Sequence, residues 1–417
     1  MRGLSNNGAL LLTRPLQVQS EVLNRPVAAA KGTESALPRL RVLHVVPVMA
    51  KHGAETVVYR LTAGSDVDHE IICLGRRDTY SAIFENAGIR VTHLNMGPTD
   101  IAALPRLFSS VRKSGAQVVQ CWMYRANLLG GLAARLAGIP VVWNIRCSSI
   151  APLRPGSRLL AYLGGALARW IPDAIVNCSG KSAELHDRFG YGRAEGVVIP
   201  NGYDSADFSL DDAARARTRT ALGIGPGDFV VGTIARWHPQ KGIPVFMRAI
   251  QQLRERNIPV RAILLGRGMD DANPELARLV QQSGCAEAVQ LLGERSDVRD
   301  IARSLDLHVL ASIGSEGFPN VVAETMLSGT PNVVTDVGDS ALIVGDTGWI
   351  VVPADAAALA DAIEAAYKQH ASAPEEWARR RDSARERIVE NFSLERMIRA
   401  YEGVWQKVAG TAVQELQ

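Results

Sequence analysis

The sequence lacks the features that mark several classes of protein. No apolar run approaches the roughly 18 residues of a membrane-spanning helix. The only apolar patch near the start, residues 9–12, is too short for the core of a signal peptide. The five cysteines lie far apart and form no CxxC pair, which argues against a zinc or disulfide framework. We therefore expect a protein of the cytoplasm.

Two further absences narrow the function. A net charge of +3 without an arginine-rich run gives no support for nucleic acid as a partner. No G-x-G-x-x-G motif opens either half of the chain after its first predicted strand, which argues against an NAD-dependent dehydrogenase. What remains is an ordinary globular composition, 47% hydrophobic and 21% charged. The length of 417 residues is too great for a single core and favours two domains.

Periodicity predicts an α/β chain. Residues 1–38 are rich in Ser, Asn, Gln, Arg and Pro and show no sustained periodicity, so we expect a poorly ordered N-terminal extension. From Leu40 onward, short β-branched runs alternate with helical patterns, as in a parallel sheet that is covered on both faces. The first set of predicted strands comprises residues 41–46, 69–74, 90–94, 117–120, 140–145 and 173–178.

The alternation starts again after a variable polar stretch at 205–227. The second set of predicted strands comprises residues 229–234, 260–265, 288–292, 307–310, 331–335 and 349–352. The pattern predicts two doubly wound, Rossmann-like domains, 39–205 and 206–391, that face one another across a cleft, with ligands bound beyond the carboxyl ends of the strands. The last segment, 392–417, is predicted to form an amphipathic helix that packs back towards the N-terminal domain.

A turn in the second domain carries two cations. Residues 235–242 read A-R-W-H-P-Q-K-G and place Arg236 and Lys241 between a predicted strand and a predicted helix. Cations at such a position can hold a diphosphate and stabilise the charge that develops on a leaving nucleoside diphosphate. For an isolated pair, a solvated Arg and Lys in a surface turn would be the commoner interpretation.

The segment at 315–324 reads S-E-G-F-P-N-V-V-A-E and carries two carboxylates. Glu324 lies about one turn into a predicted helix and is placed to reach a ribose diol, whereas Glu316 lies in the preceding loop and is placed to reach a hexose hydroxyl. The alternative is a capping carboxylate and a solvated helix glutamate. Two cations and two carboxylates together suit a ligand that is both a polyphosphate and a polyol, so we predict that the second domain binds a nucleotide-sugar.

Backbone groups of the same segment are also candidates for binding the sugar donor. Gly317 allows the chain to come close to a ligand. The N–H groups of Asn320 and Val321, at the start of the predicted helix, are expected to point at a phosphate. We assign Phe318, between them, to the same donor-binding segment.

A second glycine lies at the first strand-to-helix turn of the N-terminal domain. Residues 52–55 read H-G-A-E, and Gly53 would permit close approach to a sugar or phosphate. Glu55, in contrast, could be only a first-turn carboxylate that the helix dipole favours.

Together these motifs resemble those of the retaining glycosyltransferases of family 4, which have the GT-B fold and include enzymes of bacterial cell-surface polysaccharide synthesis. The resemblance spans residues 40–410. It rests on H-G-A-E, I-P-N-G-Y-D at 199–204, A-R-W-H-P-Q-K-G and S-E-G-F-P-N-V-V-A-E, in this order.

The resemblance implies a role for each candidate residue. Arg236 and Lys241 would hold the diphosphate of the sugar donor, and Glu316 would contact the donor sugar, which makes these three the expected catalytic residues. Glu324 would bind the ribose, and Gly53 would close the donor site from the N-terminal side. No cofactor and no catalytic metal are expected.

The resemblance also implies a reaction. A hexose-type sugar would pass from a UDP-sugar or GDP-sugar, held by the C-terminal donor domain, to a glycan or polyprenyl-linked acceptor on the N-terminal acceptor domain. The product would belong to exopolysaccharide or lipopolysaccharide synthesis. Two alternatives remain open at this point, namely a GT-B nucleotide-sugar epimerase or hydrolase and a non-catalytic nucleotide-binding GT-B protein.

The chain departs from the family pattern in its first domain. Members often carry a histidine at the ends of the strands near residues 120 and 145, where this sequence has Arg125 and Arg146. An arginine cannot act as a base at neutral pH. These arginines could bind an anionic acceptor, support the cleft as ion pairs, or, in the case of Arg125, impair activity.

Residues 154–170 combine basic ends with Leu159, Leu160, Leu163, Leu167 and Trp170 at helical spacing. Such a helix could lie on an anionic membrane surface, at the inner face of the membrane. An apolar stripe at this spacing more often faces the core of its own domain, and we predict the latter.

Overall fold

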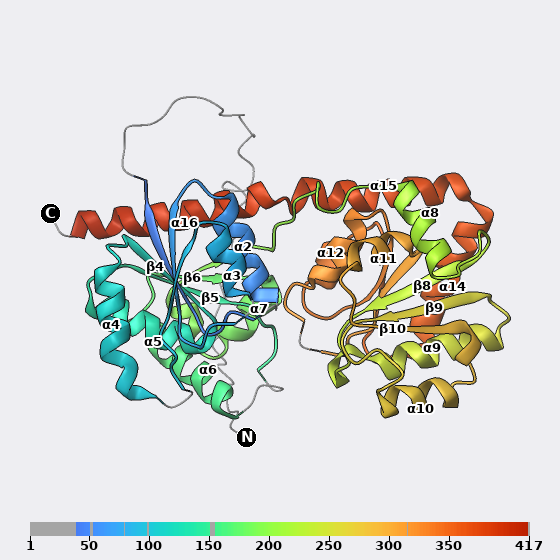
Figure 1. The fold of residues 1–417 in the computed structure, drawn as a ribbon, viewed down its shortest axis with the longest axis horizontal. Helices are drawn as coiled ribbons and strands as arrows, with labels where there is room; N and C mark the ends of the chain where they lie inside the picture. Colours follow the sequence, from blue (N-terminus) through green and yellow to red (C-terminus); the bar gives the residue numbers. More distant parts are fainter. Residues whose placement is uncertain are drawn as a thin grey trace, which may run out of the picture. The chain divides into compact units, whose positions relative to one another are not determined.

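The N-terminal half of the chain forms a seven-stranded parallel sheet (Figure 1). The structure, a computed structural model, describes residues 39–50, 53–78, 80–97, 100–150, 155–314 and 316–415, and the predicted extension 1–38 lies outside them. The strand order is β3-β2-β1-β4-β5-β6-β7. The strands are β1 (Arg41–Val46), β2 (Asp68–Cys73), β3 (Arg90–His93), β4 (Val118–Trp122), β5 (Val141–Ile145), β6 (Ala174–Asn177) and β7 (Glu195–Val198).

Helices cover both faces of this sheet, because alternate residues of β1 point to opposite sides. Leu43 and Val45 join a core that includes α4, α5 and α6, whereas Val42 and Val46 join one that includes α2, α3 and the C-terminal helix α16. The elements in question are α2 (Gly53–Gly64), α3 (Ser81–Asn86), α4 (Leu104–Lys113), α5 (Met123–Leu136), α6 (Pro155–Leu167), α7 (Gly180–Asp187) and α16 (Leu394–Glu415).

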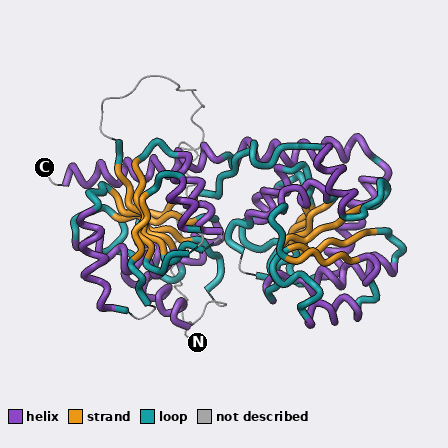
Figure 2. Tube along the Cα trace, viewed as in Figure 1, coloured by secondary structure: helices purple, strands orange, loops and turns teal. Residues whose placement is uncertain are grey.

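The C-terminal half forms a six-stranded parallel sheet in the order β10-β9-β8-β11-β12-β13. Its strands are β8 (Phe229–Ile234), β9 (Val260–Leu265), β10 (Val289–Gly293), β11 (Leu307–Leu310), β12 (Asn332–Thr335) and β13 (Trp349–Val351). Its helices are α8 (Asp212–Ala221), α9 (Ile243–Glu255), α10 (Pro274–Gln282), α11 (Val298–Ser304), α12 (Asn320–Leu327), α13 (Ser340–Val344), α14 (Ala356–Ser372) and α15 (Pro374–Asn391). Figure 2 shows both sheets flanked by helices, which confirms the predicted α/β class with two doubly wound sheets.

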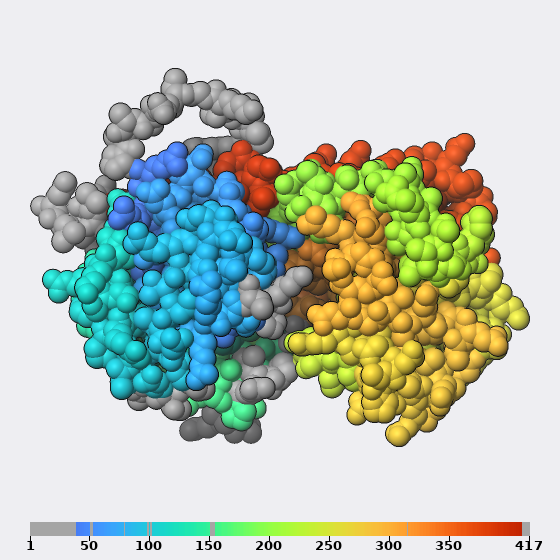
Figure 3. Space-filling model, in the orientation of Figure 1, coloured from blue at the N-terminus to red at the C-terminus, as the bar shows by residue number. Residues whose placement is uncertain are grey.

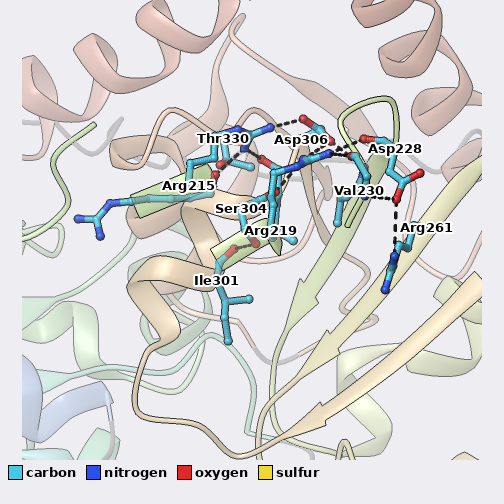
Figure 4. A network of polar contacts seen from close by, with 12 residues as sticks. Arg215, Arg219, Asp228, Val230, Arg261, Ile301, Ser304, Asp306 and Thr330 are labelled. Atoms are coloured by element: carbon cyan, nitrogen blue, oxygen red, sulfur yellow. Dashed lines mark hydrogen bonds and ion pairs between the residues drawn. The ribbon is translucent and has the colours of Figure 1, made fainter. Parts of the chain in front are cut away.

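Helix α8 occupies part of the stretch that the sequence presented only as variable and polar. Its Arg215 and Arg219 reach the carboxylate of Asp306, which is 5% exposed and also accepts the backbone N–H of Val230 at 2.8 Å (Figure 4). Arg219 contacts Asp306 at 3.0 Å. A buried carboxylate shared by two guanidinium groups therefore fastens this polar helix to the amino ends of β8 and β11.

Helix α6 corrects one prediction. Its buried residues are the small ones, Ala161, Gly164 and Gly165. Of its large apolar residues, Leu160 is partly buried against the core and the others are exposed. A Cβ atom at Gly164 would collide with the Tyr191 hydroxyl group, and one at Gly165 would collide with the carbonyl oxygen of Phe189. The glycines thus allow the helix backbone to press against this turn, and the prediction that the leucine stripe faces the core is wrong.

Within the described ranges, none of the helices is long and apolar enough to cross a lipid bilayer.

Candidate functional site

The turn with the two cations is fixed at the carboxyl edge of the C-terminal sheet. A single turn of 3-10 helix, Pro239–Lys241, follows β8, and Gly242 then adopts a left-handed conformation with φ of 64° before α9 begins. A side chain at Gly242 would collide with the carbonyl oxygen of Ala311. The backbone N–H of Ile313 donates to the carbonyl of Gln240 at 2.8 Å, so the turn is joined to the loop between β11 and α12.

This junction brings Lys241 and Glu316 together. The Nζ atom of Lys241 lies 2.5 Å from Oε1 of Glu316, and Ser312 donates its hydroxyl to the same oxygen at 2.6 Å. The Glu316 side chain is only 10% exposed and that of Lys241 is 24% exposed. The ammonium group is therefore held at the edge of the sheet by a carboxylate that is itself anchored, and it retains donor capacity because only one of its protons points at Oε1.

Arg236 lies in the same turn but is exposed and makes no ion pair with any residue that the structure describes. The backbone beside it is fixed, since Trp237 donates its N–H to the carbonyl of Arg267 at 2.8 Å. Burial lowers the pKa of the His238 imidazole, and the nearby charges of Arg236 and Lys241 lower it further. The turn is thus locally positive, as an anion site requires.

Glu324 has a partner that the sequence did not reveal. Its Oε1 atom accepts from Nη2 of Arg60, on α2 of the N-terminal half, at 3.1 Å. The Arg60 guanidinium also lies over the ring of Tyr203, 5.0 Å from its centroid. Glu324 keeps a second carboxylate oxygen, so the ion pair and a ribose hydroxyl could be served by the same group.

Gly53 and Asn320, both predicted to bind the sugar donor, lie close together. A Cβ atom at Gly53 would be 3.5 Å from Nδ2 of Asn320. The Asn320 side chain is held from the opposite side by the N-G-Y motif, since its Oδ1 accepts from Asn201 at 2.6 Å and from the Tyr203 hydroxyl at 2.7 Å. Asn201 and Tyr203 therefore position the start of α12 against the start of α2.

The remaining donor-binding candidates differ in what they expose. Gly317 lies against the N-terminal half, where an added Cβ would be 3.0 Å from the Cys178 sulfur and 3.1 Å from the Arg146 carbonyl oxygen. Phe318 is buried and its ring packs on Phe392 with centroids 5.3 Å apart, so only its backbone is available to a ligand. Val321, in the first turn of α12, is partly exposed.

The two arginines of the N-terminal half lie in different settings. Arg125 donates to the carbonyl groups of Met96 and Gly97, which fits a role in holding that loop. Arg146 donates through Nη2 to Oδ1 of Asn201 and lies 5.8 Å from the centroid of Trp122. Its Nη1 atom is buried and, among the described residues, has no hydrogen-bond partner. The Nε atom of Arg125 is likewise buried and without a hydrogen-bond partner among the described residues, so both arginines keep a donor for a ligand.

Arg60, Ser312 and Asn201 complete the site and were missed at the level of sequence. Asn201 lies in a motif that was recognised but given no role. Arg60 is 264 positions from Glu324 and carries no local signal, because a helix arginine is usually solvated. No group of three or more His, Cys, Asp or Glu residues able to hold a metal ion occurs in the described part of the chain.

Two family models match the chain. Residues 40–202 match the model described as "Glycosyl transferase 4-like domain", and residues 228–369 match "Glycosyl transferases group 1". The two matches cover the N-terminal and C-terminal sheets in turn, and the second contains Arg236, Lys241, Glu316 and Glu324.

Curated relatives and solved structures agree with these matches. The chain is 29% identical over 334 residues to the lipopolysaccharide core biosynthesis mannosyltransferase LpcC of Rhizobium leguminosarum bv. viciae, covering 78% of this chain and 89% of the relative. It is 25% identical over 255 residues to the UDP-Gal:alpha-D-GlcNAc-diphosphoundecaprenol alpha-1,3-galactosyltransferase of Escherichia coli, covering 59% of this chain and 64% of that protein. The structure of Anabaena Alr3699/HepE in complex with UDP superposes with a TM-score of 0.79 at 20% identity, over 88% of this chain and all of the other.

Proposed function

Since the chain belongs to the glycosyltransferases of family 4, with the GT-B fold, we propose that it transfers a hexose-type sugar from a nucleoside-diphosphate sugar with retention of configuration. The sugar donor would be a UDP-sugar or a GDP-sugar. The acceptor would be a glycan or a polyprenyl-linked sugar of lipopolysaccharide or exopolysaccharide synthesis.

One observation carries this proposal: Lys241 and Glu316 meet at 2.5 Å at the carboxyl edge of the C-terminal sheet. Edges of this kind bind the ligands of doubly wound folds. The pair offers a cation for a phosphate oxygen next to a carboxylate for a sugar hydroxyl, which are the two chemistries of a nucleotide-sugar. The relatives support the choice of ligands, since one is named a mannosyltransferase of the lipopolysaccharide core, one is named for a diphosphoundecaprenol acceptor, and one solved structure holds UDP.

The proposed mechanism uses charge rather than a protein base. Lys241 and Arg236 would stabilise the negative charge that develops on the leaving diphosphate, whose oxygen would take the proton of the attacking hydroxyl on the same face of the sugar. The carboxylate of Glu316 would hold the hexose in position. The reaction would need no metal ion. The same hypothesis places the protein in the cytoplasm, in peripheral contact with the inner face of the membrane.

Substitution of the two cations tests the assignment. Lys241→Ala and Arg236→Ala should each lower kcat by about 10²–10³, which is the usual loss for one transition-state contact of this kind. Arg248→Ala, an exposed arginine on α9, is the matched control and should retain activity. Near-normal turnover in either site variant would refute the assignment.

The reaction itself is tested with the unmodified protein. Transfer to an acceptor should persist in EDTA, and the anomeric configuration of the product, read by NMR, should match that of the sugar donor. Turnover of nucleotide-sugars without any acceptor, at the rate seen with one, would instead favour an epimerase or hydrolase.

A further inference from the structure

Helix α6 presents an apolar face to solvent. The face consists of residues that are each more than a third exposed, which are Leu159, Tyr162, Leu163, Leu167 and, just beyond the helix, Trp170. Leu159 is 59% exposed and Trp170 is 56% exposed. We call these five residues the α6 apolar face. Because Gly164 and Gly165 are pressed against the turn at Phe189 and Tyr191, the helix cannot rotate to bury its leucines.

Neighbouring residues extend this surface. The adjacent helix α5 adds Leu132, which is 44% exposed, and Leu136, which is 68% exposed. Arg135 of α5 donates its Nε–H to the carbonyl of Trp170, just beyond α6, at 3.1 Å. Exposed large apolar residues on two neighbouring helices are a candidate binding surface.

The segment that carries the face has charge of one sign, although Asp173, directly after it, pairs with Arg135 at 3.1 Å. Residues 101–172 contain nine Lys and Arg and no Asp or Glu. The other 37 of the chain's 46 cations are outnumbered by its 43 acidic residues, so the excess of positive charge is concentrated in this one segment. Such a run attracts a negatively charged partner and repels a second copy of itself.

A surface hollow of about 720 Å³ borders the face. Tyr162 lines it from α6, together with Arg188 and Arg193 from the turn after α7. Both arginines are exposed and make no ion pair within the described residues, although the acidic Asp187 also lines the hollow. The Tyr162 ring contacts Phe189 with centroids 5.3 Å apart, so the hollow and the apolar face are continuous.

We propose that the α6 apolar face docks on the anionic surface of a lipid bilayer. The leucines would enter the boundary between headgroups and acyl chains, the rings of Tyr162 and Trp170 would lie at headgroup level, and the arginines would meet lipid phosphates. This deepens the membrane contact of the proposed function by naming the surface that makes it. Binding to lipid needs neither sugar donor nor acceptor, so the experiment below is independent of the transfer reaction.

The apolar part of the proposal is tested by flotation of the full-length protein with vesicles of phosphatidylcholine mixed with phosphatidylglycerol. Leu159→Gln/Leu163→Gln should lower the partition coefficient by at least about tenfold, because each leucine loses its burial in the acyl boundary. Leu342→Gln/Val389→Gln changes two equally exposed apolar residues of the C-terminal half and should leave binding unchanged. Equal binding of the first variant and the wild type, or equal loss in both variants, would overturn the proposal.

The charged part is tested by neutralising two arginines. Arg158→Gln/Arg188→Gln should weaken binding to the anionic vesicles by about fivefold for each cation removed, with no effect on vesicles of phosphatidylcholine alone. Arg248→Gln/Arg278→Gln, which removes two exposed arginines from the C-terminal half, is the control of equal charge. Added salt should weaken wild-type binding.

Sedimentation velocity without lipid tests the alternative that a second copy of the chain covers the α6 apolar face. A monomeric wild type that keeps its thermal stability in the Leu159→Gln/Leu163→Gln variant supports the proposal. A wild-type dimer that the same variant dissociates would assign the face to a second copy of the chain and overturn docking on lipid.

Discussion

Glu316 and Glu324 lie in one segment with seven residues between them but are held by different cations. Lys241, from the same half of the chain, contacts Glu316 at 2.5 Å, whereas Arg60, from the N-terminal half, contacts Glu324 at 3.1 Å. Charge-assisted hydrogen bonds of this kind fix the direction of a carboxylate. The free oxygens of the two glutamates are therefore oriented before any ligand binds, which lowers the entropic cost of binding.

The two glutamates can be separated by their ligands. Glu324→Gln should weaken the binding of UDP or GDP alone, because its expected partner is the ribose. Glu316→Gln should leave binding of the free nucleotide nearly unchanged and weaken binding of the nucleotide-sugar by about tenfold or more, since a hydrogen bond to a charged group contributes about 1.5–3 kcal/mol. Titration calorimetry with both ligands measures the difference, and equal losses for the free nucleotide would contradict it.

A second prediction concerns the buried Nη1 atom of Arg146. If this atom binds an anionic acceptor, Arg146→Ala should lower kcat/KM for the acceptor by roughly tenfold or more while the affinity for the sugar donor stays constant. Arg125→Ala is the comparison, because Arg125 donates to backbone carbonyl groups and should act through stability instead. Steady-state kinetics with each substrate varied would show the division. Unchanged acceptor kinetics in Arg146→Ala would mean that this arginine supports the structure of the site and does not bind the acceptor.

At the scale of elements, the strands could be predicted because buried parallel strands are continuous apolar runs. The ends of the predicted strands lie within two residues of the ends observed in the structure. Strand β7, at the edge of its sheet, was not predicted, because it is only four residues long (E-G-V-V) and none of them is buried. Helix α8 was missed because its inward face is charged and becomes buried only by pairing with Asp306, which follows Arg215 by 91 positions and Arg219 by 87.

The same reasoning explains which part of the site could be predicted. Motifs that lie within one loop, such as Arg236 with Lys241 and Glu316 with Glu324, carry a local signal. The pairing of Glu324 with Arg60, and the direction in which α6 turns its leucines, depend on contacts between distant segments. For α6 the deciding feature is the close approach to the turn at Phe189, which helical periodicity does not report.

The anchor of α8 should be measurable as stability. Asp306→Ala would leave two partly buried guanidinium groups and the Val230 N–H without their acceptor, and we expect the free energy of unfolding to fall by about 3–5 kcal/mol. Asp228→Ala removes a more exposed carboxylate, 3.5 Å from Arg261, and should cost about 1 kcal/mol or less. Urea denaturation of both variants gives the comparison. A loss as small for Asp306→Ala as for Asp228→Ala would show that α8 is held by other contacts.

At the scale of the whole molecule, the chain returns to its first sheet after completing its second. Helix α16 follows the C-terminal half in sequence but lies beside α2, as Figure 1 and Figure 3 show. Its Tyr401 and Trp405 are fully buried against the N-terminal sheet, and Trp405 donates its indole N–H to Gln120 of β4 at 2.9 Å. The core on this face of the sheet is therefore incomplete until the last helix has been made.

Two histidines lie beneath this helix, and we expect them to make its packing sensitive to acid. The rings of His44 and His69 lie 5.8 Å and 5.7 Å from that of Trp405. Trp122 donates its indole N–H to Nδ1 of His44 at 3.1 Å, which leaves the proton of neutral His44 on Nε2, facing Nδ1 of His69 at 3.0 Å. A second proton on either ring would set two donors against each other. Burial accordingly lowers the pKa of His44 well below its usual value and that of His69 to about 4.

The lowered pKa values fix the direction of the pH dependence. Below an unfolded pKa of about 6.5 the unfolded chain takes up protons that the folded chain does not bind, so stability should fall as the pH drops from about 6.5 towards 4. Each histidine contributes a slope of at most about 1.4 kcal/mol per pH unit in that range. His69→Gln keeps a hydrogen-bonding group beside His44 but removes one titrating site. The free energy of unfolding of this variant, measured by urea denaturation, should therefore fall less steeply with decreasing pH than that of the wild type. At pH above about 7 the two values should be close. An unchanged slope in His69→Gln would mean that the acid sensitivity lies elsewhere than beneath α16.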